Sequence, residues 1–224
     1  MKDYKAAAYS EAAAIIKELG LLPLAPLIPG YPALNTITEP ESWHAGGDSD
    51  PWTWRTRFAG EGIAAYGKFI SKKAVFISKD LVPLFLAVLG KNDVTEERYH
   101  KGEFSKEALT LFSLISAEEG IDTRLLRKKA NLLGKEHKKA FDQGLQELQG
   151  SMDIVISGIK EKQNEAGETN GWNSTSYETM EGWLEKNGIE RLSISKEEAK
   201  EKLLQHFCLI CNDEGMKKIS KILS

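Results

Sequence analysis

The sequence predicts a mainly α-helical fold with small β-hairpins, of the α+β class. Apolar residues recur at helical spacing through most of the chain, as in Leu109, Phe112 and Ile115. Two short runs, 73–78 and 152–159, have the β-branched bias of strands. A chain of 224 residues can bury a substantial core, in one large domain or two small ones. We therefore expect modules of a few short helices and a β-hairpin, packed into one compact body.

The composition is that of an ordinary globular protein. Hydrophobic residues make up 41% of the chain and charged residues 28%, with a net charge of −3. No apolar run reaches the ~18 residues that a membrane span needs, and the first residues lack the apolar core of a secretion signal. Two cysteines without an export signal indicate a reducing compartment and no disulfide framework. The expectation is a cytoplasmic protein with no membrane partner.

Local signals divide the first hundred residues into a few elements, which we treat as an N-terminal helical part, 1–100. Five prolines between 21 and 40 exclude a long regular element there. Asp50-Pro51 suits a helix entry, with aspartate as the cap. The expected elements are a helix over 3–19 ended by Gly20, a helix from Pro51 through Phe69, a strand over 73–78, and a helix over 81–89 capped by Ser78 or Asp80 and ended by Gly90.

Residues 101–187 have the clearest pattern. Ser105 caps a first helix, Asp122 or Thr123 caps a second over 124–133, and a third covers 135–148. A strand over 152–159, a polar loop with Asn170-Gly171 and a return strand over 172–177 follow. Three short helices and a hairpin make up the winged-helix order. The remaining part, 188–224, opens with a capping box, Ser195 to Glu198, and ends in a short helix over 213–223.

The second and third helices of this unit are strongly basic. Residues 124–139 hold seven lysines and arginines against one acid, a local charge of +6. Lysines and arginines at a helix-turn-helix neutralise phosphates, while polar side chains reach base edges. The candidate nucleic-acid-binding residues are Arg124, Arg127, Lys128, Lys135, His137, Lys138, Lys139 and Gln143. A solvated charged face is the alternative, and the loop over 160–171, with three glutamates against two lysines, counts against DNA.

A second candidate region is rich in tryptophan. Aromatic rings beside an arginine suit a pocket that stacks a planar base, and the candidate pocket residues are Trp43, His44, Trp52, Trp54 and Arg55. The weak catalytic candidates are three carboxylates that desolvation could turn into an acid or base, Asp48, Asp50 and Glu61. The alternative, which we favour, is that the tryptophans belong to the core and the aspartates cap and turn the chain.

Metal and cofactor chemistry find little support. Cys208 and Cys211 follow His206, but tetrahedral zinc needs four ligands and the other histidines have no suitable spacing. We therefore expect both thiols in the core and no metal. Phosphate-binding and dinucleotide-binding glycine motifs are absent, so no cofactor is expected. The lysines near residue 70 are interpreted as only a basic turn.

These residues together resemble the AlkZ-related group, relatives of the bacterial winged-helix glycosylases that excise alkylated or crosslinked purines. The resemblance rests on Trp43-His44, Asp50 to Arg55, Ala65 to Lys68, Phe76 to Ser78 and Phe141 to Gln149. It implies tandem winged-helix-like modules with a concave surface that faces DNA, double-stranded or damaged.

The resemblance does not carry an activity with it. The glycosylases use a Gln-aliphatic-Gln or Gln-aliphatic-Asp motif to position water, and no glutamine here begins one. We therefore expect a non-catalytic, or catalytically degenerate, DNA-binding protein. An active glycosylase-like enzyme on damaged DNA and a protein–protein interaction module remain as alternatives.

Overall fold

The computed structural model describes residues 2–91, 93–160 and 173–224. Helices predominate, and the described strands form two small antiparallel sheets of three strands each. The predicted fold class is therefore confirmed. Among the described residues, no helix is both long and apolar enough to cross a bilayer.

The first sheet belongs to a unit near the N-terminus. A helix, a strand and two further helices lead into a hairpin, and the sheet order is β1-β3-β2. In chain order the elements are α1 (Tyr9–Leu19), β1 (Leu21–Pro23), α2 (Leu34–Ile37), the 3-10 turn η1 (Pro40–Ser42), α3 (Pro51–Gly60), β2 (Ala64–Ile70) and β3 (Lys73–Ser78).

The second sheet belongs to a unit with the same order of elements. Its sheet order is β4-β6-β5, so in both sheets the strand that comes last in the sequence lies between the other two. The elements are α6 (Lys106–Ala117), β4 (Ile121–Asp122), α7 (Thr123–Lys129), the 3-10 turn η2 (Lys135–His137), α8 (Lys138–Gly150), β5 (Ile154–Lys160) and β6 (Ser174–Thr179). The predicted series of three helices followed by two strands is found here.

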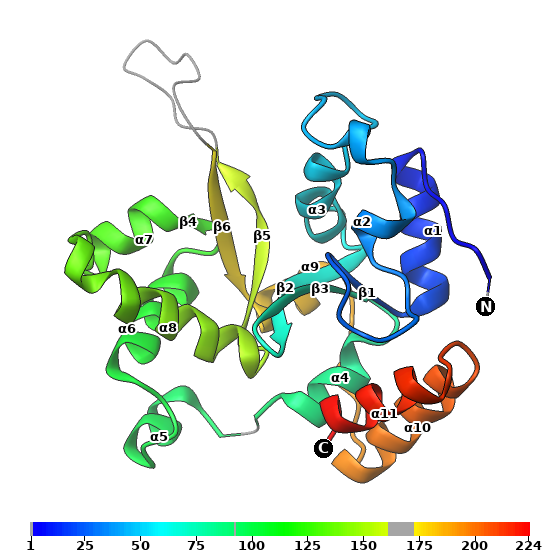
Figure 1. Cartoon of the computed structure of the whole chain (residues 1–224). Helices are drawn as coiled ribbons and strands as arrows, with labels where there is room; N and C mark the ends of the chain where they lie inside the picture. Colours follow the sequence, from blue (N-terminus) through cyan, green and yellow to red (C-terminus); the bar gives the residue numbers. More distant parts are fainter. Residues whose placement is uncertain (1, 92, 161–172) are drawn as a thin grey trace.

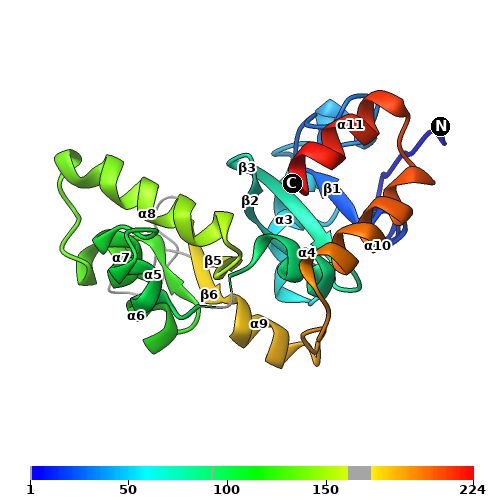
Figure 2. The ribbon, with the colours of Figure 1, turned by 90° about the horizontal axis from the view of Figure 1, so that it is seen from below.

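Further helices connect and close the two units. α4 (Val82–Leu89) and α5 (Thr95–His100) lead from the first unit to the second, and α9 (Met180–Lys186) leaves it. α10 (Lys196–Cys208) then packs on α4, and α11 (Asp213–Ile222) packs on α10. The C-terminal helices thus return to the first unit, as seen from below in Figure 2.

The two units pack reciprocally. α3 of the first unit lies against β5 of the second, and α8 of the second unit lies against β2 of the first (Figure 1). Two hydrogen bonds cross this interface. Trp183 donates from Nε1 to the Ala59 carbonyl at 2.9 Å in a buried position, and Gln149 accepts from the Lys68 amide at 2.9 Å. One continuous apolar core results.

Several predicted boundaries are wrong. The helix expected from Pro51 through Phe69 ends at Gly60, and Gly62 turns the chain at a φ of +68°. Residues 64–70 form β2 instead, with Tyr66 opposite Phe76. Ala65 and Phe69 are at helical spacing, but β2 is buried on both faces, and such a strand lacks the alternation that would reveal it.

Helix starts also differ from the prediction. α1 begins at Tyr9, where the Glu11 carboxylate accepts hydrogen bonds from the Ala7 and Ala8 amides. α4 is capped by Leu81 without a side-chain hydrogen bond, so neither Ser78 nor Asp80 is its cap. The Ser105, Asp122 and Ser195 caps are confirmed, because each side chain accepts a bond from a first-turn amide. The Asn170-Gly171 turn lies outside the described residues.

Candidate nucleic-acid interface

The two arginines of the basic segment 124–139 make contacts within the protein. Arg127 donates from Nε to the Leu132 carbonyl at 2.9 Å, and its guanidinium lies 5.4 Å from the centre of the Phe141 ring. Arg124 pairs with Asp122 at 3.4 Å and donates to the Lys160 carbonyl at 3.3 Å. Arg127 therefore holds the backbone that leads into η2 and α8. Arg124 instead links the start of α7 to the end of β5.

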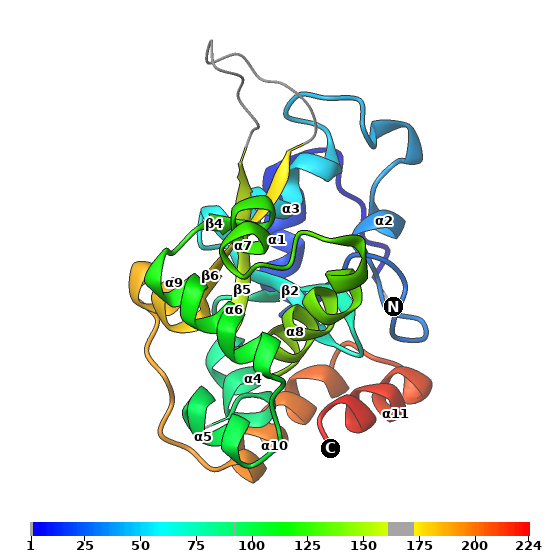
Figure 3. The same ribbon diagram turned by 90° about the vertical axis from the view of Figure 1, so that its left-hand side faces the viewer.

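The lysines of this segment have a different environment. Lys135, Lys138 and Lys139 are exposed and line one cleft along α8, together with Gln143. The cleft has a volume of about 850 Å³. Its remaining lining residues are Lys72, Asp142, Gln146 and Glu147. Half of the predicted nucleic-acid-binding residues are thus brought to one surface. The helix α8, along which they lie, is seen in Figure 3.

The charges of this cleft are unbalanced. Glu147 is already occupied, because one carboxylate oxygen accepts from the Ser105 amide and hydroxyl and the other from Gln143. Asp142 is the other acid of the lining. Within the described part of the chain, none of the four lysines in the lining takes part in a salt bridge. Four lysines against two carboxylates leave the lining with a surplus of positive charge, and such a surplus attracts anions.

The other two predicted residues lie apart from this lining. Lys128 is exposed on α7, and His137 is exposed and lies 3.6 Å from the Glu136 carboxylate. Lys72 is the residue that sequence reasoning missed. It lies in the turn between β2 and β3, where the lysine run was interpreted as only a basic turn. The two-residue spacing between the strands is the signal that could have identified a hairpin tip.

The tryptophan-rich segment is divided between core and surface. Trp54 is fully buried and donates from Nε1 to the Asp48 carbonyl at 2.7 Å. Trp43 is half-buried and donates to Thr38 at 2.9 Å. Trp52 is 45% exposed, with the Arg55 guanidinium 3.3 Å from the centre of its ring and the His44 ring centre at 4.5 Å. Only three of the five candidate pocket residues therefore lie together at the surface.

Those three residues line a second hollow of about 650 Å³. It lies between α3 and the β5–β6 hairpin, and Ile159 and Thr175 form its opposite wall. The position corresponds to that of the lysine cleft, because each hollow lies between the third helix of one unit and the hairpin of the other. Arg55 also contacts the Tyr66 hydroxyl at 3.4 Å. A planar ligand would have to displace the Arg55 or His44 contact to reach Trp52.

The three carboxylate candidates have structural partners. Asp50 is 2% exposed and accepts from the amides of Trp52, Gly46 and His44. Burial opposes ionisation of Asp50, but these hydrogen bonds outweigh it and lower the pKa of the carboxyl. Asp48 is exposed and lies 3.5 Å from Arg57. Asp50 thus caps α3, and Asp48 pairs with the same helix.

Glu61 closes the other end of that helix. It accepts from the Tyr9 hydroxyl at 2.8 Å and from Arg57 Nε at 3.1 Å. The hydrogen bond from Tyr9, together with Arg57, lowers the pKa of Glu61. A carboxylate held in its ionised form by two donors is poorly suited to deliver a proton.

A family model described as AlkZ related matches residues 6–224, nearly the whole chain. The chain belongs to the AlkZ-related family. This membership relates it to the AlkZ-type DNA glycosylases. Neither the curated proteins nor the solved structures contain a match.

The glutamines of α8 in this AlkZ-related protein differ in their surroundings. Gln143 is exposed in the lysine cleft and Gln146 is half-buried there. Gln149 is buried, accepts from the Lys68 amide and donates to the Leu145 carbonyl at 3.1 Å. The three follow one another at helical spacing along α8, so none is arranged as a Gln-aliphatic-Gln pair.

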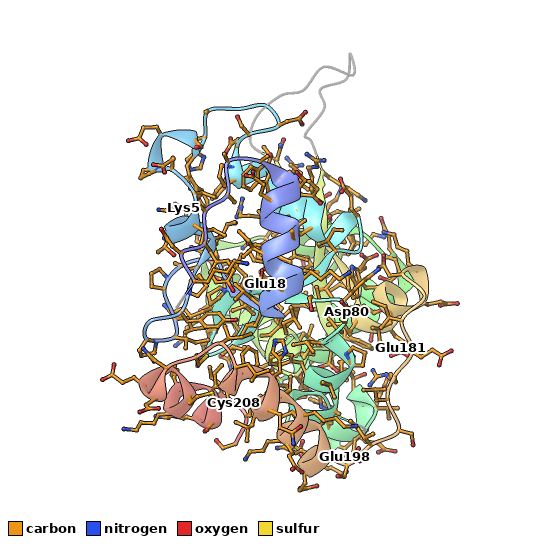
Figure 4. All side chains as sticks on the ribbon, turned by 90° about the vertical axis from the view of Figure 1, so that its right-hand side faces the viewer. Lys5, Glu18, Asp80, Glu181, Glu198 and Cys208 are labelled. Atoms are coloured by element: carbon orange, nitrogen blue, oxygen red, sulfur yellow. The ribbon has the colours of Figure 1, made fainter. Side chains whose placement is uncertain are left out.

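The cysteine prediction is wrong for Cys208, which is exposed rather than in the core. α10 directs Phe207 inward and fully buries it, so the next residue lies on the outer side (Figure 4). Cys211 is half-buried past the helix end, and burial raises the pKa of its thiol to about 11. The described residues contain no group of three or more His, Cys, Asp or Glu able to hold a metal ion.

Proposed function

We propose that this AlkZ-related protein binds double-stranded DNA without catalysis, through a winged-helix unit over 101–187. The observation that carries the proposal is the cleft along α8, where Lys135, Lys138 and Lys139 converge without ion pairs among the described residues. Lysines of this kind bind phosphates by releasing condensed counterions.

The positions on α8 suit a run of phosphates. Residues 138, 139, 142, 143 and 146 of α8 follow a spacing of three and four, which places them on one face, and Lys135 precedes them in η2. At 1.5 Å per residue the face from 138 to 146 is about 12 Å long. Phosphates of one DNA strand repeat every ~3.4 Å along the axis, so a face of this length can follow about three of them.

The contacts of the carboxylates support the proposal that the protein has no catalytic activity. Asp50 is committed to three backbone amides, and Glu61 to Tyr9 and Arg57. A general acid or base must have a free lone pair or proton near the substrate. We therefore propose that this protein shares DNA binding with the glycosylases but not the excision of bases.

Fluorescence anisotropy with labelled duplex DNA at two salt concentrations tests the binding. The variant Lys138→Glu/Lys139→Glu should lose at least about tenfold in affinity, because it reverses two phosphate contacts. The matched control is Lys217→Glu/Lys221→Glu, which makes the same charge change at exposed positions of α11. Equal affinity of the two variants, or no binding by the wild type, would contradict the proposal.

A base-release assay on alkylated duplex DNA tests the second half of the proposal. We expect binding without release of free base. Release that disappears in Asp50→Asn or Glu61→Gln but persists in Asp48→Asn would instead identify an enzyme.

A further inference from the structure

We infer that Lys72, at the tip of the β2–β3 hairpin, is a DNA phosphate contact, so that the DNA site spans both units. This inference rests on the proposed function and extends it to the first unit. Lys72 belongs to the first unit and α8 to the second, yet Lys72 lines the same cleft as Lys135, Lys138 and Lys139.

The backbone at this tip is strained. Ser71 and Lys72 have φ values of +50° and +61°, and they connect Ile70 to its partner Lys73. A two-residue turn with both φ values positive is normally made by asparagine and glycine, which tolerate the left-handed region. A lysine here has a conformational cost, and strain of this kind concentrates at binding sites.

The hairpin is held in place against α8. The buried side chain of Gln149 accepts from the Lys68 amide at 2.9 Å, four residues before Lys72 in the same hairpin. Because β2 also packs on α8, the hairpin has a defined position beside the helix (Figure 1). Lys72 is thus presented to the cleft by a fixed scaffold.

The lysines that line the cleft favour an anionic ligand. Lys72 adds a fourth cation to a lining whose acids are Asp142 and the already occupied Glu147. Lys135, Lys138 and Lys139 lie within five consecutive positions, about 6 Å of helical rise, and Lys72 adds a cation from the neighbouring hairpin. Successive phosphates of one DNA strand, ~3.4 Å apart along the axis, supply several anions to such a group of cations, so Lys72 can contribute a contact of its own.

Lys73 provides a matched control. It is the next residue, it is exposed like Lys72, and it does not line the cleft. Replacement of either lysine by alanine removes the same charge from the same hairpin. A general electrostatic effect would be equal for the two, whereas a phosphate contact belongs to Lys72 alone.

The experiment compares Lys72→Ala, Lys73→Ala and Lys72→Gly by duplex-DNA anisotropy across a salt series. Lys72→Ala should weaken binding about fivefold and make the slope of log K against log salt less negative by about 0.9, with Lys73→Ala close to wild type. Lys72→Gly should weaken binding equally while its melting temperature stays the same or rises, because glycine relieves the positive φ.

The outcomes separate this inference from the function on which it rests. If Lys72→Ala and Lys73→Ala bind alike while Lys138→Glu/Lys139→Glu binds weakly, DNA binding by α8 stands and the role of Lys72 is overturned. If the wild-type protein does not bind duplex DNA, both fall. If Lys72→Gly binds like the wild type, the lysine side chain is not a contact.

Discussion

The Gln149 side chain accepts a hydrogen bond from the backbone amide of Lys68, although the two residues are 81 positions apart. Gln149 is 3% exposed, and its amide nitrogen donates to the Leu145 carbonyl within α8. This single side chain therefore joins the third helix of one unit to the hairpin of the other. Together with the packing of β2 on α8, this bond holds the hairpin that carries Lys72 beside the helix that carries Lys138 and Lys139.

Replacement of Gln149 by leucine should destabilise the protein by about 1–2 kcal/mol, because the Lys68 amide loses its acceptor in a part-buried position. Urea denaturation measures the change. Gln205→Leu is the control, since Gln205 is exposed on α10 and that change should stay within about 0.5 kcal/mol. Similar stability of the two variants would show that water replaces the Gln149 contact.

The Asp50 cap predicts a dependence of stability on pH. Its pKa is lowered in the folded protein, so its contribution is fully present above the unfolded pKa of about 3.9 and is lost as the pH falls through the folded value. Asp50→Asn should therefore be less stable than wild type by about 1–2 kcal/mol at pH 7. The difference should shrink toward pH 3.

Denaturant titrations at several pH values between 3 and 7 follow that difference. Asp48→Asn provides the comparison, because the Asp48 side chain is exposed. A constant gap between Asp50→Asn and wild type over the whole range would mean that the charge of Asp50 has no part in the cap.

Arg98 and Asp153 form an ion pair that is largely buried. Arg98 is 3% exposed, and its guanidinium donates to both Asp153 oxygens, at 2.8 and 3.0 Å. Burial raises the pKa of Asp153 even though Arg98 lowers it. Arg98→Met leaves that carboxylate buried without its partner and should cost about 3–5 kcal/mol.

The exposed pair between Arg191 and Glu181 is the control for this change. Its N–O distance is 2.7 Å, but both side chains are open to solvent, so Arg191→Met should cost under about 1 kcal/mol. Thermal unfolding of the two methionine variants at equal concentration compares them. Equal losses would contradict the importance of burial.

Trp54 and Trp52 should differ sharply in their contribution to stability. Trp54→Ala empties a fully buried site and removes the bond to the Asp48 carbonyl, at a cost of about 3–5 kcal/mol. Trp52→Ala loses mainly the cation–π contact with Arg55, about 1 kcal/mol or less. Iodide should quench the fluorescence of Trp52 in the wild type and leave Trp54 protected. An unstable Trp52→Ala would place that ring in the core as well.

Local signals were sufficient for much of the second unit. Ser105 and Asp122 cap helices as predicted, because the oxygen of a cap and the apolar spacing after it act within a few residues. β2 was missed for a physical reason, since a strand buried on both faces shows no alternation. The basic patch was recognised from composition. Tertiary packing, however, decides that Arg127 binds a backbone carbonyl while Lys138 lines the cleft with no ion pair among the described residues.

The features that could not be predicted from the sequence depend on contacts between residues far apart in the chain. Lys72 reaches the cleft only because its hairpin lies against a helix more than sixty positions later in the chain. The equivalence of the two units is one of topology and not of residues, so no repeat is visible in the sequence. Trp52 and Trp54 differ by two positions, and only the direction of α3 decides which is buried.

The reciprocal packing of the units has a consequence for how the chain folds. α3 and α8 each cover a strand of the other half, so neither half can be separated without uncovering apolar surface. Stability of that kind is shared, and local opening of one half removes support from the other. The whole chain should melt in a single cooperative transition, with calorimetric and van't Hoff enthalpies in agreement.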